Sequence, residues 1–374
     1  MVLIIGASVA LLCLLFFFDL ILTLVALAPV VFAFVCTLGT LKLIGHPLDI
    51  PGLMLSIVVL GMGIDYSLFF VRSYQRYLDE QHPSLGLIRM AVFLASASTL
   101  IGFGVLNTAD HSMLKGAGLT SFTGIAYSLI GAFVILPPLL KNLFAYKQFP
   151  VENIKPGSKK HLTKIVKRYG HLEVSIRLFV RYKIMFDPIF TELFKFIKSA
   201  EKIIDINSRY GLCAVCLLEI FPKAKVYGIE PDDHRARIAS AVTGERGEIE
   251  CARLPDIPQP KDPVDCAVMI DLIQNLNDNE FKFILNKLKN QLCSGGNLLL
   301  RAAVPINPAA FWMVWCKNVW IKITGKKPCY RSKEQIKEVL LQSGFKIEAV
   351  EPSGAGRKKC WILAKVKPNY NEIP

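Results

Sequence analysis

The sequence predicts a membrane α-helical bundle of about five transmembrane helices, followed by an α/β domain built on a mostly parallel sheet. Three observations support this prediction. Apolar stretches dominate residues 1–145, strand and helix patterns alternate from about residue 200, and the two parts differ in charge. Residues 1–145 hold six Lys or Arg and six Asp or Glu, so the whole net charge of +14 lies in the rest of the 374-residue chain. A neutral apolar part followed by a basic polar part indicates a membrane domain joined to a soluble one.

Five apolar stretches have roughly the 20 residues that a membrane-spanning helix requires. They cover about residues 2–18, 20–45, 51–71, 87–107 and 114–140. Asp19 alone separates the first two stretches, and the first has neither a basic start nor a small-residue cleavage site. A signal peptide would need both. We therefore interpret the first stretch as a span that ends in a tight turn at Asp19.

The connections between the apolar stretches predict the orientation. The connection at 72–86 and the segment after residue 140 carry Arg and Lys, whereas the connections at 45–50 and 108–113 carry neither. Cytoplasmic loops of membrane proteins are enriched in these residues. We therefore expect the N-terminus outside the membrane, and the domain that follows the bundle in the cytoplasm.

One ionisable side chain, Asp65, lies deep in the third apolar stretch. It follows Gly61 and Gly63 and precedes Tyr66. A carboxylate in lipid is costly and is by default a functional hypothesis, and small residues let helices pack closely in the membrane. A carboxylate beside a tyrosine that can share its proton suits a proton relay. The alternative is that Asp65 caps a kink or bonds Tyr66 or a nearby Ser or Thr.

Four motifs mark the apolar part: Leu43-Ile44-Gly45-His46-Pro47-Leu48, Gly61-Met62-Gly63-Ile64-Asp65-Tyr66, Ser98-Thr99-Leu100-Ile101-Gly102-Phe103, and Gly118 through Leu136-Pro137-Pro138. With these motifs, residues 1–145 resemble the C-terminal membrane bundle of an MMPL-type exporter of the RND superfamily. The resemblance implies that Asp65 and Tyr66 belong to the proton relay. It covers only the last spans of such an exporter, so we expect the chain not to pump alone. A second chain would supply the remaining transporter half, or the sequence is a fragment of a longer exporter.

A basic connection, predicted to be helical, covers residues 146–198. Nine Lys or Arg lie within 155–183, where Glu173 is the one acidic residue. Basic segments beside a membrane attract anionic lipids, so we expect membrane lipids as partners. A solvated helix face is the alternative. Nucleic acid is not expected as a partner, because no binding motif accompanies the charge.

Strand and helix patterns alternate in residues 199–367, with 368–374 as a tail. Alternation of this kind predicts a parallel sheet between helices, and the closely spaced last two strands predict an antiparallel final strand. Strands are expected at 202–206, 225–229, 248–252, 264–271, 297–301, 346–351 and 359–365, and helices at 210–221, 232–242, 278–292, 308–324 and 333–343.

Acidic residues end three of the expected strands. Asp205 ends the first strand, Glu230 the second and Asp271 the fourth. Because the carboxyl ends of parallel strands meet at one edge of the sheet, we expect these side chains to converge there. An acid after the second strand can accept both hydroxyls of a ribose, so the pattern indicates a nucleoside cofactor.

The motifs of this part are Ile204-Asp205-Ile206, Tyr210-Gly211, Phe221 through Asp232, Leu292 through Leu299, and Ser343-Gly344-Phe345. Over about 195–367 they resemble a class I S-adenosylmethionine-dependent methyltransferase. The resemblance implies a Rossmann-like, seven-stranded, mostly parallel sheet, and S-adenosyl-L-methionine as the cofactor. It further implies cofactor contacts from Asp205, Asn207, Gly211, Glu230 and Asp271.

The first motif departs from the family pattern, because Asn207 and Arg209 stand where the family has glycines. Glycine takes positive φ easily and lets the backbone approach a ligand. Asn tolerates the left-handed region, whereas Arg209 brings bulk and positive charge close to a cofactor that is itself a sulfonium cation. Both a working and a degenerate cofactor site remain open.

The sequence therefore predicts a membrane-tethered methyltransferase fused to part of an exporter, in the bacterial inner (cytoplasmic) membrane. Its expected substrate is a membrane-associated lipid or polyketide-like acceptor. The alternative is a non-catalytic transporter subunit or fragment with a degenerate docking domain. No Ser/His/Asp or metal constellation identifies a base, so the catalytic residues are unknown and no metal is expected. Cys213 and Cys216 are interpreted as core residues, and a helix at 307–325 as an interfacial lid or a core-packing helix.

Overall fold

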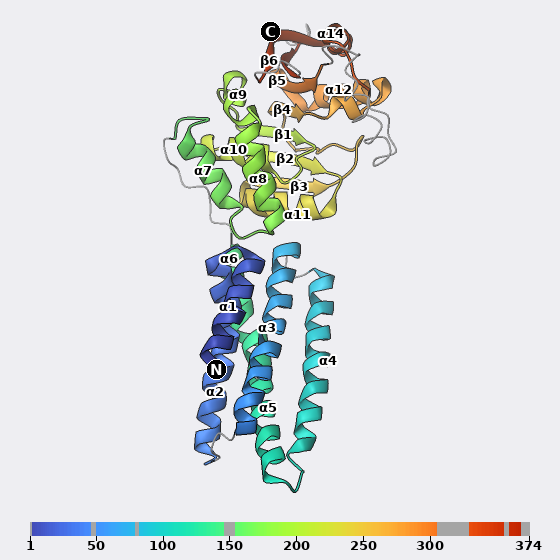
Figure 1. Cartoon of the computed structure of the whole chain (residues 1–374). Helices are drawn as coiled ribbons and strands as arrows, with labels where there is room; N and C mark the ends of the chain where they lie inside the picture. Colours follow the sequence, from blue (N-terminus) through green and yellow to red (C-terminus); the bar gives the residue numbers. More distant parts are fainter. Residues whose placement is uncertain are drawn as a thin grey trace, which may run out of the picture. The chain divides into compact units, whose positions relative to one another are not determined.

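The computed structural model describes residues 2–45, 50–78, 82–145, 154–304, 329–354 and 359–367. The chain forms two compact units. The first unit holds residues 1–145 together with 170–177, and the second holds 146–169 and 178–374. Figure 1 shows the first unit as a bundle of helices and the second as a sheet with helices around it. The helix predicted at 307–325 and the His46-Pro47-Leu48 part of the first motif lie outside the described residues.

Apolar helices make up the first unit. Three of its helical segments, Leu20–Leu43, Pro83–Leu106 and Ser112–Phe144, are long and apolar enough to cross a membrane, judged over the described residues. The first helix is apolar but shorter. The helices are α1 (Val2–Phe17), α2 (Leu20–Leu43), α3 (Ile50–Tyr77), α4 (Pro83–Leu106) and α5 (Ser112–Ile130), which continues through a π-helical turn (Gly131–Ile135) into α6 (Leu136–Phe144).

The connection between α1 and α2 is the tight turn predicted at Asp19. Phe18 takes the left-handed conformation, with φ of 48°. The Asp19 carboxylate caps α2 by accepting hydrogen bonds from the backbone N–H groups of Ile21, at 2.9 Å, and Leu22, at 3.2 Å. These N–H groups have no partner inside the helix, so the cap stabilises the start of α2 next to the turn.

Small residues allow the helices of this unit to approach closely. A Cβ atom on Gly124 of α5 would lie 2.6 Å from a methyl carbon of Val59 in α3. A Cβ atom on Gly131 would lie 3.0 Å from the Cβ of Pro29 in α2. Larger side chains at these glycines would push the helices apart, as expected for helix packing in lipid.

The second unit begins with short helices, one of which starts in residues 174–177 of the first unit, and continues as the α/β domain. Its strands are those predicted from the sequence, with ends that differ by a few residues. The helices are α7 (Lys159–Arg168), α8 (Val174–Phe186), α9 (Ile189–Phe196), α10 (Leu212–Ile220), α11 (Asp233–Thr243), α12 (Asp278–Gln291) and α14 (Lys333–Gln342), and the strands are β1 (Lys202–Ile206), β2 (Lys225–Glu230), β3 (Gly247–Cys251), β4 (Val264–Ile270), β5 (Leu292–Ala303), β6 (Phe345–Ser353) and β7 (Lys359–Val366).

The sheet has seven strands in the order β3-β2-β1-β4-β5-β7-β6. Strands β1 to β5 pair with one another in parallel, whereas β7 is antiparallel to both β5 and β6. The predicted fold class, with its antiparallel final strand, is therefore confirmed. Strand order reverses between β1 and β4, and in open parallel sheets such a switch point opens a crevice at the carboxyl ends of the strands.

Alternation along the strands gives the sheet two different faces. Ile204 and Ile206 of β1 and Leu298 and Leu300 of β5 belong to a hydrophobic core shared with α12 and α14. Successive strand residues point to opposite faces. Asp205 and Arg301 therefore point to the other face, where polar groups gather at the ends of β1, β4 and β5.

Candidate functional site

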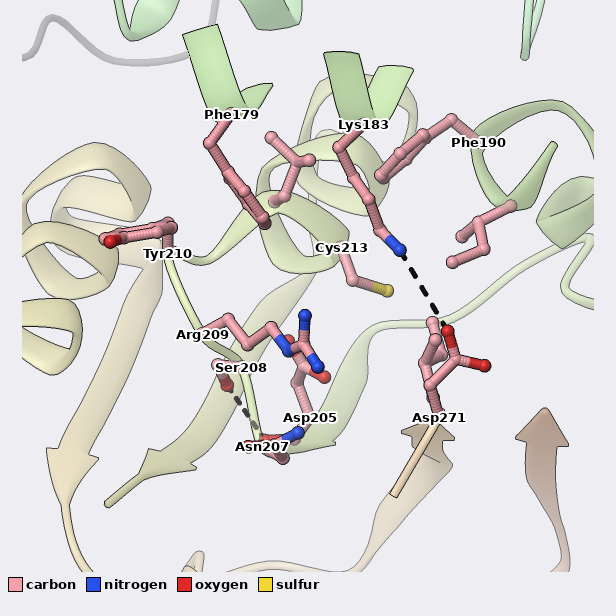
Figure 2. Close-up of a pocket in the computed structure, with 13 residues that line it drawn as sticks. Phe179, Lys183, Phe190, Asp205, Asn207, Ser208, Arg209, Tyr210, Cys213 and Asp271 are labelled. Carbon is pink, nitrogen blue, oxygen red and sulfur yellow. Dashed lines mark hydrogen bonds and ion pairs between the residues drawn. The ribbon is translucent and has the colours of Figure 1, made fainter. Parts of the chain in front are cut away.

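A pocket lies at the carboxyl ends of β1 and β4, at the switch point of the sheet. Its empty volume is about 490 Å³, including the part open to solvent. The lining comes from β1, β4, the loop after β1, and helices α8, α9 and α10 (Figure 2). The lining residues are Phe179, Lys183, Ile189, Phe190, Asp205, Asn207, Ser208, Arg209, Tyr210, Leu212, Cys213, Ile270 and Asp271.

The loop after β1 keeps a glycine-like backbone although two of its residues are not glycine. Asn207, Arg209 and Gly211 all take the left-handed conformation, with φ of 66°, 53° and 72°. The left-handed region is unfavourable for a non-glycine residue by a conformational energy on the order of 1–2 kcal/mol. This energy is smaller for Asn than for Arg, because the short Asn side chain is tolerated there. The loop therefore follows a backbone course that glycine adopts easily.

Hydrogen bonds hold this loop in place. The Ser208 N–H donates to the carbonyl of Ile229 at 3.0 Å, and the Gly211 N–H donates to the carbonyl of Ser208 at 2.8 Å. Gly211 is needed for packing, because a Cβ atom there would lie 3.0 Å from the Cα of Ala239 in α11. Gly211 thus shapes the loop from behind and does not line the pocket.

Asp205 is the buried carboxylate of the pocket. The residue is only 2% exposed, and its Oδ2 has no hydrogen-bond partner among the described residues. Burial raises the pKa of Asp205 to about 7, and the nearby carboxylate of Glu230 acts in the same direction. A buried carboxylate without a partner is costly, so a cation placed in the pocket would be stabilised by Asp205.

Glu230 lies behind the loop instead of in the pocket. It is fully buried, and its Oε2 accepts a hydrogen bond from the backbone N–H of Arg209 at 2.8 Å. The guanidinium of Arg235 lies 3.7 Å from its Oε1. Burial raises the pKa of Glu230, although the Arg209 N–H and the Arg235 charge oppose this rise. In this arrangement the Glu230 carboxylate holds the loop after β1. Its contact with a ribose remains a prediction.

Arg209 extends its side chain into the pocket, as Figure 2 shows. Two acidic residues of the lining, Asp205 and Asp271, are thus accompanied by two basic ones, Arg209 and Lys183. The positive charge of Arg209 is the feature of this site that most opposes a cationic ligand.

A cluster of charges surrounds Asp271 at the end of β4. Its Oδ2 lies 2.6 Å from the Lys359 amine, 3.6 Å from the Arg301 guanidinium and 4.0 Å from the Lys183 amine. Arg301, which is 3% exposed, also lies 2.7 Å from Asp187. Burial alone would raise the pKa of Asp187, but the hydrogen bond from Lys183 and the charge of Arg301 outweigh it and lower this pKa. The cluster fixes the position of Asp271 beside the pocket.

The apolar wall of the pocket comes from helices that precede the sheet. Phe179 of α8 and Ile189 and Phe190 of α9 line it. Sequence reasoning treated this region as a linker and missed these residues, together with Lys183 and the cluster around Asp271. One signal could have pointed to the cluster, namely a lone Arg301 in the apolar run of β5.

The predicted site residues are therefore brought together only in part. Asp205, Asn207 and Asp271 line one pocket, whereas Gly211 and Glu230 support its loop from behind. Among the described residues no group of three or more His, Cys, Asp or Glu could hold a metal ion. Cys213 lines the pocket and Cys216 is fully buried, and burial raises the pKa of both thiols.

The predicted relay residues lie in α3 of the first unit. Tyr66 is buried, at 6% exposure, whereas Asp65 is exposed on the side of the bundle. Successive helix residues are about 100° apart around the axis, so the two side chains leave the helix in different directions. Their roles in a proton relay remain predictions.

Comparison with known proteins relates the first part of the chain to one family. Residues 1–168 match the model of the MMPL family. A membrane protein of Methanocaldococcus jannaschii is 28% identical over 121 residues, which are 30% of this chain. The matched region spans 31% of the length of that relative. Together with the apolar helices, these findings associate the chain with a membrane.

The solved structures similar to this chain include methyltransferases. An S-adenosylmethionine-dependent methyltransferase from Mesorhizobium loti is 16% identical, with a TM-score of 0.42, over 48% of this chain and 99% of its own. A mitomycin 7-O-methyltransferase is 15% identical, with a TM-score of 0.41, over 75% of this chain and 96% of its own. The fold class of this chain rests on the strand order of its own sheet.

Proposed function

We propose that the protein is a membrane-tethered S-adenosylmethionine-dependent methyltransferase that acts on a membrane-associated acceptor of the lipid or polyketide type. The observation that carries this proposal is Asp205, a buried carboxylate with an unpartnered oxygen in a pocket at the switch point of the sheet. A ligand with positive charge would relieve the cost of that burial. S-adenosylmethionine carries such charge on its sulfonium and its ammonium group.

The residues of the pocket fit the methionine part of this cofactor. Asp205 would hold the cationic end, and the left-handed loop from Asn207 to Gly211 leaves its backbone close to the ligand. When bound, the cofactor supplies an electrophilic methyl group. The chain's part is to hold the acceptor in line with that group, because positioning alone provides much of the rate enhancement. Phe179 and Phe190 would bind the apolar body of the acceptor and exclude water.

Calorimetric titration of S-adenosylmethionine into the full chain in nanodiscs tests this proposal. We expect micromolar binding by the natural sequence and binding at least tenfold weaker in Asp205→Asn, which keeps the shape but not the charge. The exposed Asp256 provides a matched control, because Asp256→Asn removes an equal charge from a residue that does not line the pocket. Equal binding by all three proteins would contradict the role of Asp205.

A second candidate function, a non-catalytic docking module, is favoured by the same loop. Arg209 occupies part of the pocket with a cation, and Glu230 is engaged by the loop N–H and not by the pocket. If the natural sequence binds no S-adenosylmethionine while its sheet is folded, this reading replaces the first one. The MMPL segment then defines what the protein does.

For the membrane part we propose a protein neighbour at the exposed side of α3, in the bacterial inner membrane. Asp65 is exposed there, and a carboxylate facing lipid alone is costly. A second chain that supplies the remaining transporter half would cover it. A photoreactive amino acid in place of Phe69, which lies one turn further on and is 60% exposed, tests this proposal. Adducts with lipid and none with protein would refute it.

A further inference from the structure

Helix α8 carries an apolar surface that no part of the described structure covers. Leu178, Tyr182, Met185 and Phe186 are 44%, 56%, 64% and 74% exposed. Their spacing of four, three and one residues places them on one side of the helix. The rings of Tyr182 and Phe186 stack on each other, with centroids 6.0 Å apart. A contiguous apolar patch of this kind marks a binding surface more often than a chance arrangement.

The opposite side of the same helix belongs to the pocket. Phe179 and Lys183 line the pocket, and Val180 is fully buried against the rest of the domain. Figure 2 shows Phe179 and Lys183 entering the pocket from α8. One helix therefore separates the pocket from the exposed apolar surface, and whatever covers that surface lies one helix diameter from the pocket.

The exposed charges that α7 and α8 carry are positive. Arg181 is exposed at the edge of the apolar stripe, and Lys159 and Lys167 are exposed on α7. Neither α7 nor α8 contains an acidic residue. Clustered cations of this kind are attracted to anionic lipid headgroups. A tyrosine at the margin of an apolar stripe is also typical of a membrane interface.

We propose that the outer face of α8, formed by Leu178, Tyr182, Met185 and Phe186, docks on the lipid surface of the membrane that anchors this chain. The apolar side chains enter the interface, and the cations of α7 and α8 contact anionic headgroups. A second copy of this face is a poor occupant, because two surfaces with cations and no acids repel each other. The chain has helices of membrane length before residue 145, so α8 is covalently tethered to a part of the chain that is suited to a bilayer.

The docked helix gives the pocket a route to molecules that reside in the bilayer. This consequence rests on the proposed function, since it assigns the acceptor of the methyl group to the class of membrane-resident apolar compounds. Phe179 and Phe190 on the pocket wall suit such a compound. The docking of α8 itself does not depend on methyl transfer and is tested without it.

Photocrosslinking of the full chain in nanodiscs of phosphatidylcholine and phosphatidylglycerol tests the docking. A benzophenone amino acid replaces Tyr182 or Met185 in separate variants. The control is Lys223, an exposed residue just before β2, at the opposite edge of the sheet from the pocket. We expect phospholipid adducts at 182 and 185 at a yield at least fivefold above that at 223. Adducts with protein at 182 and 185, or lipid yields no higher than at 223, would overturn the proposal.

Two further measurements separate this inference from the proposed function. Replacing phosphatidylglycerol with phosphatidylcholine should lower the lipid adducts severalfold, because the cations lose their partners. Tyr182→Ser combined with Met185→Ser should abolish docking but leave the affinity for S-adenosylmethionine unchanged, since neither residue lines the pocket. Lipid adducts without cofactor binding would support the docking surface and contradict the methyltransferase. Cofactor binding without lipid adducts would support the methyltransferase and contradict the docking surface.

Discussion

Replacing Asp205 with asparagine should stabilise the α/β domain at neutral and alkaline pH. The carboxylate is 2% exposed and its Oδ2 has no hydrogen-bond partner among the described residues. Folding therefore removes the charge from water without replacing its hydration by hydrogen bonds to Oδ2, and the ionised form is disfavoured. Asparagine has nearly the same shape and carries no charge, so the substitution removes the penalty without leaving a cavity.

The size of the effect follows from the shift in pKa. Burial raises the pKa of Asp205 from 3.8 to about 7. Because one pKa unit corresponds to 1.36 kcal/mol, the ionised form costs the folded state about 4 kcal/mol. The folded state binds the proton more tightly than the unfolded chain. The contribution of Asp205 to stability is therefore fully present below pH 3.8 and is lost as the pH rises through about 7.

Hydrogen exchange of the β1 amides in the full chain, held in nanodiscs, measures this effect. These amides lie in the centre of the sheet between β2 and β4, so they exchange only when the domain opens. At pH 8 we expect the β1 amides of Asp205→Asn to exchange more slowly than those of the natural sequence, by a factor that corresponds to a few kcal/mol in the free energy of opening. At pH 5 we expect the two exchange rates to lie closer together. The exposed Asp256→Asn should match the natural sequence at both pH values.

A difference between Asp205→Asn and the natural sequence that does not change with pH would refute this reasoning. So would a variant that exchanges faster at pH 8, because Asp205 would then hold the loop after β1 through its charge. Exchange is compared within one pH at a time, so the intrinsic effect of pH on the amides cancels.

Two further substitutions test the loop and the charge cluster. Arg209→Gly removes a cation from the pocket and relieves the left-handed strain, so the Kd of S-adenosylmethionine should fall about tenfold, or about 1.4 kcal/mol, in calorimetry with the full chain. Weaker binding would show instead that Arg209 holds the carboxylate of the ligand. Arg301→Met leaves Asp187 and Asp271 without their shared buried cation, so β1 exchange should report a loss of about 3 kcal/mol. A loss below about 1 kcal/mol would mean that Lys183 and Lys359 suffice to hold both carboxylates.

Much of the fold was predictable because its signals are local. Apolar runs such as Val264–Ile270, bounded by turn residues, identify buried strands, and acids that end them converge because parallel strands share one edge. Of the three acids expected to converge, Asp205 and Asp271 line one pocket. The motif also marked the loop after β1, and its left-handed backbone was foreseeable from the glycines that Asn207 and Arg209 replace.

Other features depend on contacts between distant parts of the chain. A carboxylate at a strand end can turn toward a ligand or toward its own loop. The residues around Glu230 in the sequence do not distinguish these two orientations. In the structure it turns to the Arg209 N–H. The apolar wall formed by Phe179 and Phe190 depends on how α8 and α9 dock on the sheet, which no local pattern encodes. The exposed position of Asp65 likewise depends on how α3 packs in its bundle.

The affinity for S-adenosylmethionine at pH 6 and at pH 8 tests the central claim most directly. The full chain in nanodiscs is titrated by calorimetry at both values, with Asp205→Asn as the reference for the titration of the ligand itself. With a pKa of about 7, the ionised fraction of Asp205 rises about tenfold over this range. The account predicts that the natural sequence binds about tenfold more tightly at pH 8, relative to the variant. Binding that does not change relative to Asp205→Asn, or no binding at either pH, would contradict it.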